Sequence, residues 1–257
     1  MKKTLVYQIL TIFTTLLTIA VNGLANALPL NGQGTGEISD RFAIYFVPAG
    51  YVFSIWGIIY LGLIAFTIYQ ALPAQREKPL IQKILPAYWI ANLANTVWIF
   101  LWHYEFFPLT LVAMLTLFAA LLFIYLQLSK EVPSMTVWEK WLVKVPFSIY
   151  LGWVSVATIA NATQVLYYFD WSGWGISTQI WAVIMLAVAA LLGLAMFLRE
   201  KDTAFVLVLV WALVGIALKQ ASSQMVSITA WAATGILAVT LFIGFVFNRR
   251  PVRERRI

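Results

Sequence analysis

Long apolar stretches alternate with short polar connections along almost the whole chain. A helix of about 20 apolar residues is long enough to cross the hydrocarbon core of a bilayer. The seventh stretch is the shortest of the eight. The pattern predicts an all-α fold, a polytopic membrane helical bundle of about eight transmembrane helices. The predicted spans are residues 4–27, 49–71, 85–103, 108–128, 145–168, 176–198, 203–218 and 225–247.

The positive charges fall on alternate connections between these stretches. Of the 17 Lys and Arg residues, all except Arg41 and Lys219 lie at the two chain ends or on every second connection. Short loops rich in Lys and Arg remain in the cytoplasm. We therefore expect an integral membrane protein, in the plasma (inner) membrane, with both termini cytoplasmic.

Composition excludes several classes of function. The chain is 62% hydrophobic and 11% charged. Its net charge of +7 is spread over the cytoplasmic connections, so we expect no nucleic-acid partner, whereas the basic tail at 248–257 would contact anionic membrane lipid. With no Cys and one His, a disulfide, a thiolate metal site or a His cluster is excluded. No acid lies deep inside a predicted span, which argues against a proton-coupled transporter.

Two segments near the N-terminus leave alternatives open. Lys2 and Lys3 precede an apolar stretch that ends in the signal-cleavage form Ala25-Asn26-Ala27. The stretch exceeds the usual signal core of about 7–15 residues, so we favour a retained helix; cleavage would leave seven helices. The Gly-rich segment 28–46 fits a lid over the outer mouth of the bundle or a plain linker.

Small residues recur at four-residue spacing, as Ala87 with Ala91 and Ala189 with Gly193. Such pairs allow helices to approach closely. The third span therefore offers a homodimer contact, although packing within one chain is the favoured use.

Three spans carry aromatic and amide side chains at helical spacing, so each set lies on one face of its helix. An amide in hydrocarbon must be hydrogen-bonded and should face the bundle interior. If the faces converge, they form a flat apolar cavity suited to a planar ligand; otherwise they only lock helices together. The sets are Phe53, Trp56 and Tyr60; Asn95, Trp98 and Trp102; and Tyr150, Trp153, Ala157 and Asn161.

These same residues carry a resemblance to the translocator protein / tryptophan-rich sensory protein family (TspO/MBR). The family's second helix has the pattern Pro-x-x-Trp-Val-Phe-x-x-Trp-x-x-x-Tyr, which resembles residues 48–60, PAGYVFSIWGIIY. Its third helix carries Asn-x-x-Trp, similar to residues 95–98, NTVW. Its fifth carries Pro-Tyr-x-x-Trp-x-x-x-Ala-x-x-x-Asn, similar to YLGWVSVATIAN at 150–161.

The chain also departs from the family pattern. Tyr51 stands where the family has Trp, and Ile149 stands at the position of the fifth-helix Pro. The resemblance covers the first 170 residues, so the chain resembles a long form with three extra C-terminal helices. We expect a five-helix core at 1–170, a three-helix segment at 171–247 and a basic cytoplasmic tail at 248–257.

The resemblance implies a membrane protein that binds a planar hydrophobic ligand, porphyrin- or tetrapyrrole-like, as a sensor or carrier, often as a homodimer. No cofactor is required, and no catalytic or metal-binding residue is expected. The candidate ligand-binding residues are Tyr51, Phe53, Trp56, Tyr60, Asn95, Trp98, Tyr150, Trp153, Ala157 and Asn161.

Three other functions compete with this one. A small-solute membrane transporter is the main alternative, although no convincing internal repeat supports it. An enzyme is disfavoured because no nucleophile–base pair is evident. A retinal-type photoreceptor would use Lys219, but that lysine is at the end of a span, where snorkelling to the interface explains it.

Overall fold

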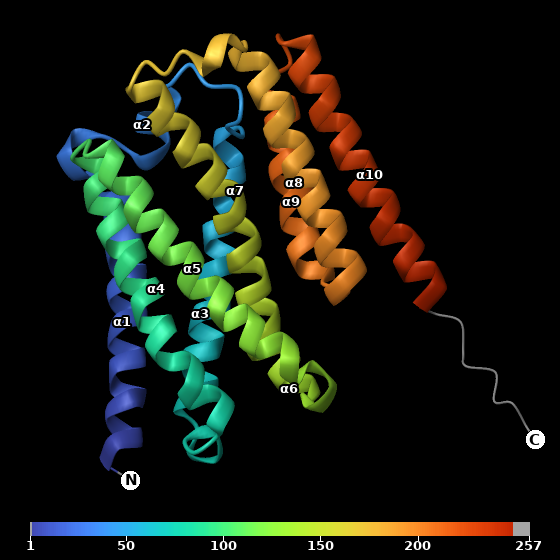
Figure 1. Ribbon diagram of the computed structural model, residues 1–257. Coiled ribbons are helices and arrows are strands. Elements are labelled where there is room, and N and C mark those ends of the chain that lie inside the picture. The colour runs from blue at the N-terminus through green and yellow to red at the C-terminus, as the bar shows by residue number, and fades with distance from the viewer. Residues whose placement is uncertain (1, 249–257) are drawn as a thin grey trace, which may run out of the picture.

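The computed structural model of the protein describes residues 2–248, so all of the tail predicted at 248–257 except its first residue lies outside the described residues. The described chain is a bundle of long helices (Figure 1). The long helices are α1 (Lys2–Ala27), α3 (Ile55–Ala71), α4 (Pro79–His103), α5 (Phe107–Glu131), α7 (Val145–Tyr168), α8 (Thr178–Glu200), α9 (Thr203–Lys219) and α10 (Gln224–Asn248). The short elements are η1 (Leu30–Gly32), α2 (Thr35–Asp40), η2 (Gly50–Ser54), η3 (Pro73–Gln75), η4 (Val132–Ser134), α6 (Val137–Glu139), η5 (Lys140–Lys144) and η6 (Gly173–Gly175).

The predicted polytopic helical bundle is confirmed. Within residues 2–248, seven helical segments are long and apolar enough to cross a membrane. The seventh predicted span, at 203–218, corresponds to α9, which is apolar but has only 17 residues. At 1.5 Å per residue it measures about 26 Å, a little less than a typical hydrocarbon core of about 30 Å.

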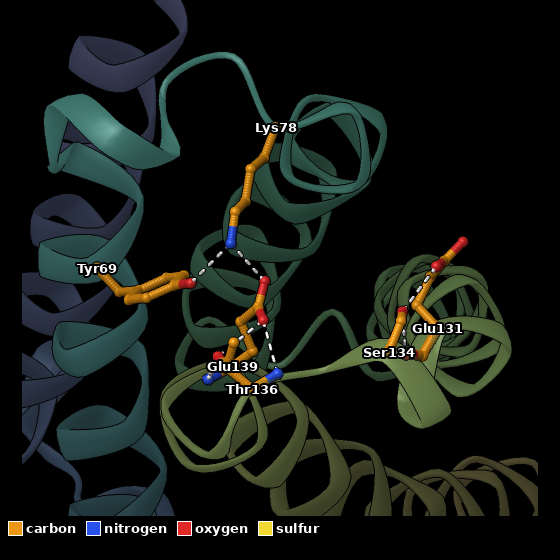
Figure 2. Close-up of polar contacts among 6 residues, drawn as sticks. All are labelled: Tyr69, Lys78, Glu131, Ser134, Thr136 and Glu139. Carbon is orange, nitrogen blue, oxygen red and sulfur yellow. Dashed lines mark hydrogen bonds and ion pairs between the residues drawn. The ribbon is translucent and has the colours of Figure 1, made fainter.

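Successive long helices run in opposite directions, so the two ends of the bundle differ (Figure 1). We call the end where α1 begins and α10 finishes the basic end, and the opposite end, which carries α2, the α2 end. The basic end carries an ion pair between Lys78 and Glu139, with 2.6 Å between Nζ and Oε1 (Figure 2). The hydrogen bond to Glu139 raises the pKa of Lys78, so this amine is charged at neutral pH. The pair ties the α3–α4 connection to α6.

A polar face of α1 packs against α4. Thr15 Oγ1 lies 2.7 Å from Tyr88 Oη, Thr18 Oγ1 donates to the Asn92 carbonyl at 2.9 Å, and Asn22 Nδ2 donates to Asn95 Oδ1 at 2.7 Å. All these side chains are buried. Hydrogen bonds of this kind satisfy polar groups that lipid could not. The first helix is therefore packed as an integral part of the bundle.

Helix α7 lies at the centre of the bundle and contacts α3, α5 and α9. It is preceded by one turn of π-helix, η5, in which Val145 N–H donates to the Lys140 carbonyl. Pro146 follows directly and has no N–H to donate to residue 142, which accounts for the irregular turn at this point.

The three C-terminal helices join the rest of the bundle through α9, which contacts both α7 and η2. Buried residues from both sides of position 170 form one continuous hydrophobic cluster. The division into units at residue 170 stays a prediction.

Small residues serve packing within the chain: a Cβ on Gly193 would come within 2.8 Å of Leu237, and Ala87 and Ala91 are buried. The homodimer contact predicted at Ala87 and Ala91 is thus occupied by the chain itself.

A buried carboxylate fixes α9 to its neighbours. Asp202 accepts hydrogen bonds from Tyr125 Oη at 2.8 Å, Ser148 Oγ at 2.6 Å and Phe205 N–H at 3.0 Å. Lys144 Nζ lies 3.7 Å from the same carboxylate. Asp202 lies between α8 and α9, in agreement with the expectation that no acid lies deep inside a span. Its carboxylate nevertheless connects α5, α7 and α9.

Replacing Asp202 by Ala should lower the free energy of unfolding by about 3 kcal/mol, because Lys144 would remain buried without its counter-ion. Adding Lys144→Met should restore part of that loss. Denaturant titration of the detergent-solubilised protein measures both. Glu77→Ala, at an exposed acid of the α3–α4 connection, is the control and should change stability by less than about 0.5 kcal/mol. A double variant no more stable than Asp202→Ala would contradict the pairing.

Candidate functional site

The segment at 28–46, predicted as a lid or a linker, is structured and is attached to the C-terminal end of α4. His103 is completely buried, with Nδ1 3.1 Å from the Leu30 carbonyl and Nε2 2.9 Å from Thr35 Oγ1. A carbonyl only accepts, so Nδ1 carries a proton. Trp102 Nε1 also donates to the Thr35 carbonyl at 3.1 Å. These bonds hold α2 across the α2 end of the bundle.

Two adjoining cavities lie directly beneath α2. The larger, of about 320 Å³, is bounded by α1, α2, η2, α3 and α4. The smaller, of about 60 Å³, extends from it toward α5 and α7. Both are lined by Thr35, Phe53, Trp56 and Trp98, so these four side chains form the boundary between them.

The walls are mainly aromatic rings in edge-to-face contact. The Trp153 ring lies 5.7 Å from Phe53 and 6.2 Å from Trp56, with interplanar angles of 83° and 84°. Trp98 stacks on Trp102 at 5.1 Å. Such edge-to-face contacts are a preferred geometry of aromatic pairs. We call the space that these rings line the slot.

The structure brings together seven of the ten candidate ligand-binding residues around these cavities. Tyr51 is one that it does not bring in: its half-exposed ring packs edge-on against Trp211 of α9 at 5.3 Å. Asn95 and Tyr150 are buried just behind the walls. The seven that line the cavities are Phe53, Trp56, Tyr60, Trp98, Trp153, Ala157 and Asn161.

The two predicted amides have internal partners. Asn161 Oδ1 accepts from Trp98 Nε1 at 3.1 Å, and its Nδ2 donates to Thr110 Oγ1 at 2.8 Å. Asn95 Oδ1 accepts from Asn22, as described above. The amides therefore lock α4, α5 and α7 together and position the aromatic walls.

Two hydrogen-bonding groups at this site are unused. Trp153 Nε1 and Tyr150 Oη are buried and find no partner among residues 2–248. Trp153 lines the smaller cavity, and the Tyr150 ring lies 6.0 Å from Trp56. A buried donor without an acceptor costs about 1–3 kcal/mol. The site can thus donate to an acceptor atom on a bound molecule.

The sequence analysis did not identify the cavity-lining residues that α1 and α2 supply, nor Gln164 of α7. Asn22 and Asn26 of α1 line the larger cavity, and Ser39 and Gln164 line the smaller. The four-residue spacing of Asn22 and Asn26 was a readable signal, but the residues of the cap follow no helical period. Among residues 2–248, no group of three or more His, Cys, Asp or Glu is placed to hold a metal ion.

Helix α9 supports the wall of the site from outside. Trp211 Nε1 donates to the Val52 carbonyl at 3.0 Å, and Ala49 N–H donates to the Gly215 carbonyl at 3.1 Å. A Cβ on Gly215 would lie 2.2 Å from Val52 Cγ2, so only glycine allows this approach. The C-terminal helices therefore hold the segment that carries Phe53.

Comparison with known proteins gives one match. The family model described as TSPO-like protein matches residues 8–243. No curated protein and no solved structure matches the chain.

Replacing Gly215 by Ala should cost about 1–3 kcal/mol of unfolding free energy, because the added methyl group overlaps buried Val52. Adding Val52→Ala should recover part of that cost by making room. Thermal unfolding of the purified protein gives both values. Gly235→Ala in α10 is the matched control, since nothing lies within 4 Å of its Cβ position. Equal stability of Gly215→Ala and the control would refute the close approach.

Proposed function

Because this chain belongs to the TSPO-like protein family, we propose that it binds a planar hydrophobic ligand of the tetrapyrrole type in the paired cavities beneath α2. The observation that carries the proposal is the slot formed by Phe53, Trp56, Trp98 and Trp153, which also presents the unused donor Trp153 Nε1. The role that we propose is that of a sensor or carrier in the membrane.

The shape and polarity of the site support a flat, largely apolar molecule. Ligand cavities commonly measure about 300–1,000 Å³ and combine apolar walls with a few polar groups. Here the larger chamber of about 320 Å³ continues past Trp56 and Trp98 into the smaller one. Edge-to-face rings around a slot favour a flat π-system over a branched aliphatic molecule.

The unused donor on Trp153 supports a ligand with acceptor atoms. Trp153 Nε1 would gain a hydrogen bond from a carbonyl or carboxylate oxygen, which a tetrapyrrole side chain carries. Asn95 and Asn161 already hydrogen-bond other side chains of the protein, and neither is needed for this hydrogen bond to the ligand.

Orientation follows from the distribution of charge. The described part of the basic end includes Arg76, Lys78, Lys83 and Lys130, whereas Arg41 and Lys219 lie at the α2 end. By the positive-inside rule we assign the basic end to the cytoplasm and the α2 cap to the opposite face, in the plasma (inner) membrane. Homodimer formation and contact with anionic lipid stay predictions.

Titration of the purified full-length protein with protoporphyrin IX, followed by tryptophan quenching, tests the proposal. We expect saturable quenching. Trp153→Phe keeps an aromatic ring, although a smaller one, and removes the N–H; it should weaken affinity roughly two- to tenfold, the value of one hydrogen bond. Ala157→Phe should fill the smaller chamber and reduce affinity further.

Trp138→Phe is the matched control, since Trp138 is exposed at the basic end, far from the site. It should leave the affinity unchanged. Quenching that rises linearly and equally in all variants would mean nonspecific partitioning. That result would reject the tetrapyrrole site and favour a small-solute transporter.

A further inference from the structure

A separate and larger cavity lies on the other side of α7, between α7 and α8. Its volume is about 580 Å³, and it shares no lining residue with the two cavities beneath α2. Figure 1 shows the two connections that border it, residues 41–49 and 169–177, side by side above these helices. Gln179 Nε2, in the first turn of α8, donates to Tyr45 Oη at 3.2 Å and links α8 to the connection at 41–49. The cavity therefore requires the C-terminal helices.

The walls are apolar and aromatic, with one charge. Tyr45, Tyr167, Trp171 and Trp181 line the cavity, and Asp170 is the only charged side chain among its lining residues. The carboxylate of Asp170 has no ion pair or side-chain hydrogen bond with the described part of the chain. The cavity thus combines aromatic rings with an unneutralised negative charge.

The basic side chains nearby are already paired. At the α2 end, Arg41 Nη2 lies 2.8 Å from Glu105 Oε1, and Lys219 pairs with Asp40. The connections at this end carry four acids, Glu37, Asp40, Glu105 and Asp170, against these two bases. This end is therefore acidic, although the whole chain is basic, and no basic residue of the described chain neutralises Asp170.

The loop that carries Asp170 is held in an unusual conformation. Asp170 and Trp174 adopt φ angles of 51° and 54°, a region that a bulky residue such as Trp seldom occupies. Gly173 has φ 65°, and a Cβ there would lie 3.2 Å from Trp181 Nε1, which donates to the Gly173 carbonyl at 3.0 Å. Packing of Trp171 on Trp181 at 5.2 Å holds the loop over the cavity.

We propose that this cavity binds a hydrophobic organic cation, an amine or quaternary ammonium with an apolar body, whose charge lies against Asp170 and the rings of Trp171 and Trp181. Aromatic faces attract cations, and Trp does so best. An apolar body would fill the chamber between α7 and α8. A tetrapyrrole with carboxylate side chains would be repelled by Asp170, so the two sites select ligands of opposite charge.

The test uses tetraphenylphosphonium and tetraphenylborate, which have the same shape and opposite charge. The full-length protein in phosphatidylcholine nanodiscs is dialysed to equilibrium against each ion, and binding to empty nanodiscs is subtracted. We expect saturable binding of the cation and none of the anion. Asp170→Asn, which tolerates the same backbone conformation, should weaken cation binding roughly fivefold or more.

Two further variants separate local recognition from other effects. Glu37→Gln removes an equal charge from the same end without touching the cavity and should leave binding unchanged. Ala182→Phe should fill the chamber and abolish binding. Excess protoporphyrin IX should not displace the cation. Equal binding of the two ions, no saturable binding, or an Asp170→Asn variant that binds like the unmodified protein would overturn the proposal.

Discussion

The need to hydrogen-bond polar groups inside an apolar medium governs this structure, and the contact between α1 and α4 shows it most directly. Lipid offers no partner for a threonine hydroxyl or an asparagine amide. Thr15, Thr18 and Asn22 therefore fix the rotation and depth of α1 against Tyr88, Asn92 and Asn95. Once α4 is fixed, its last two turns place Trp98, Trp102 and His103, and these residues position the cavity wall and α2.

Helix α7 is the wall common to both binding regions. Its Trp153, Ala157 and Asn161 face the aromatic slot, whereas Thr158, Ala162 and Thr163 face the cavity shared with α8. Residues three and four apart share a helix face, so these two sets point in different directions. Asp202 and Lys144 fix α7 to α9 near the basic end, and Gly215 allows α9 to reach η2. The C-terminal helices thereby support one site and complete the other.

The two regions differ in electrostatic character. The slot beneath α2 presents one donor without an acceptor, Trp153 Nε1, which suits a ligand with an oxygen acceptor. The cavity between α7 and α8 presents an unpaired carboxylate beside indole rings, which suits a cation. Each proposed ligand class follows from a polar group that has no partner within the described chain.

The sequence by itself determined the class of fold, the number of long helices and which aromatic side chains share a helix face. Those features depend on hydrophobic length and on helical spacing, which are properties of local sequence. Only the tertiary structure decided that Asn95 and Asn161 serve as locks, that Tyr51 packs on Trp211, and that Asp202 and His103 are buried. Those outcomes depend on contacts between residues far apart in the chain. The cavity beside Asp170 is of the same kind, because its walls come from α7, α8 and two connections that meet only in the folded bundle.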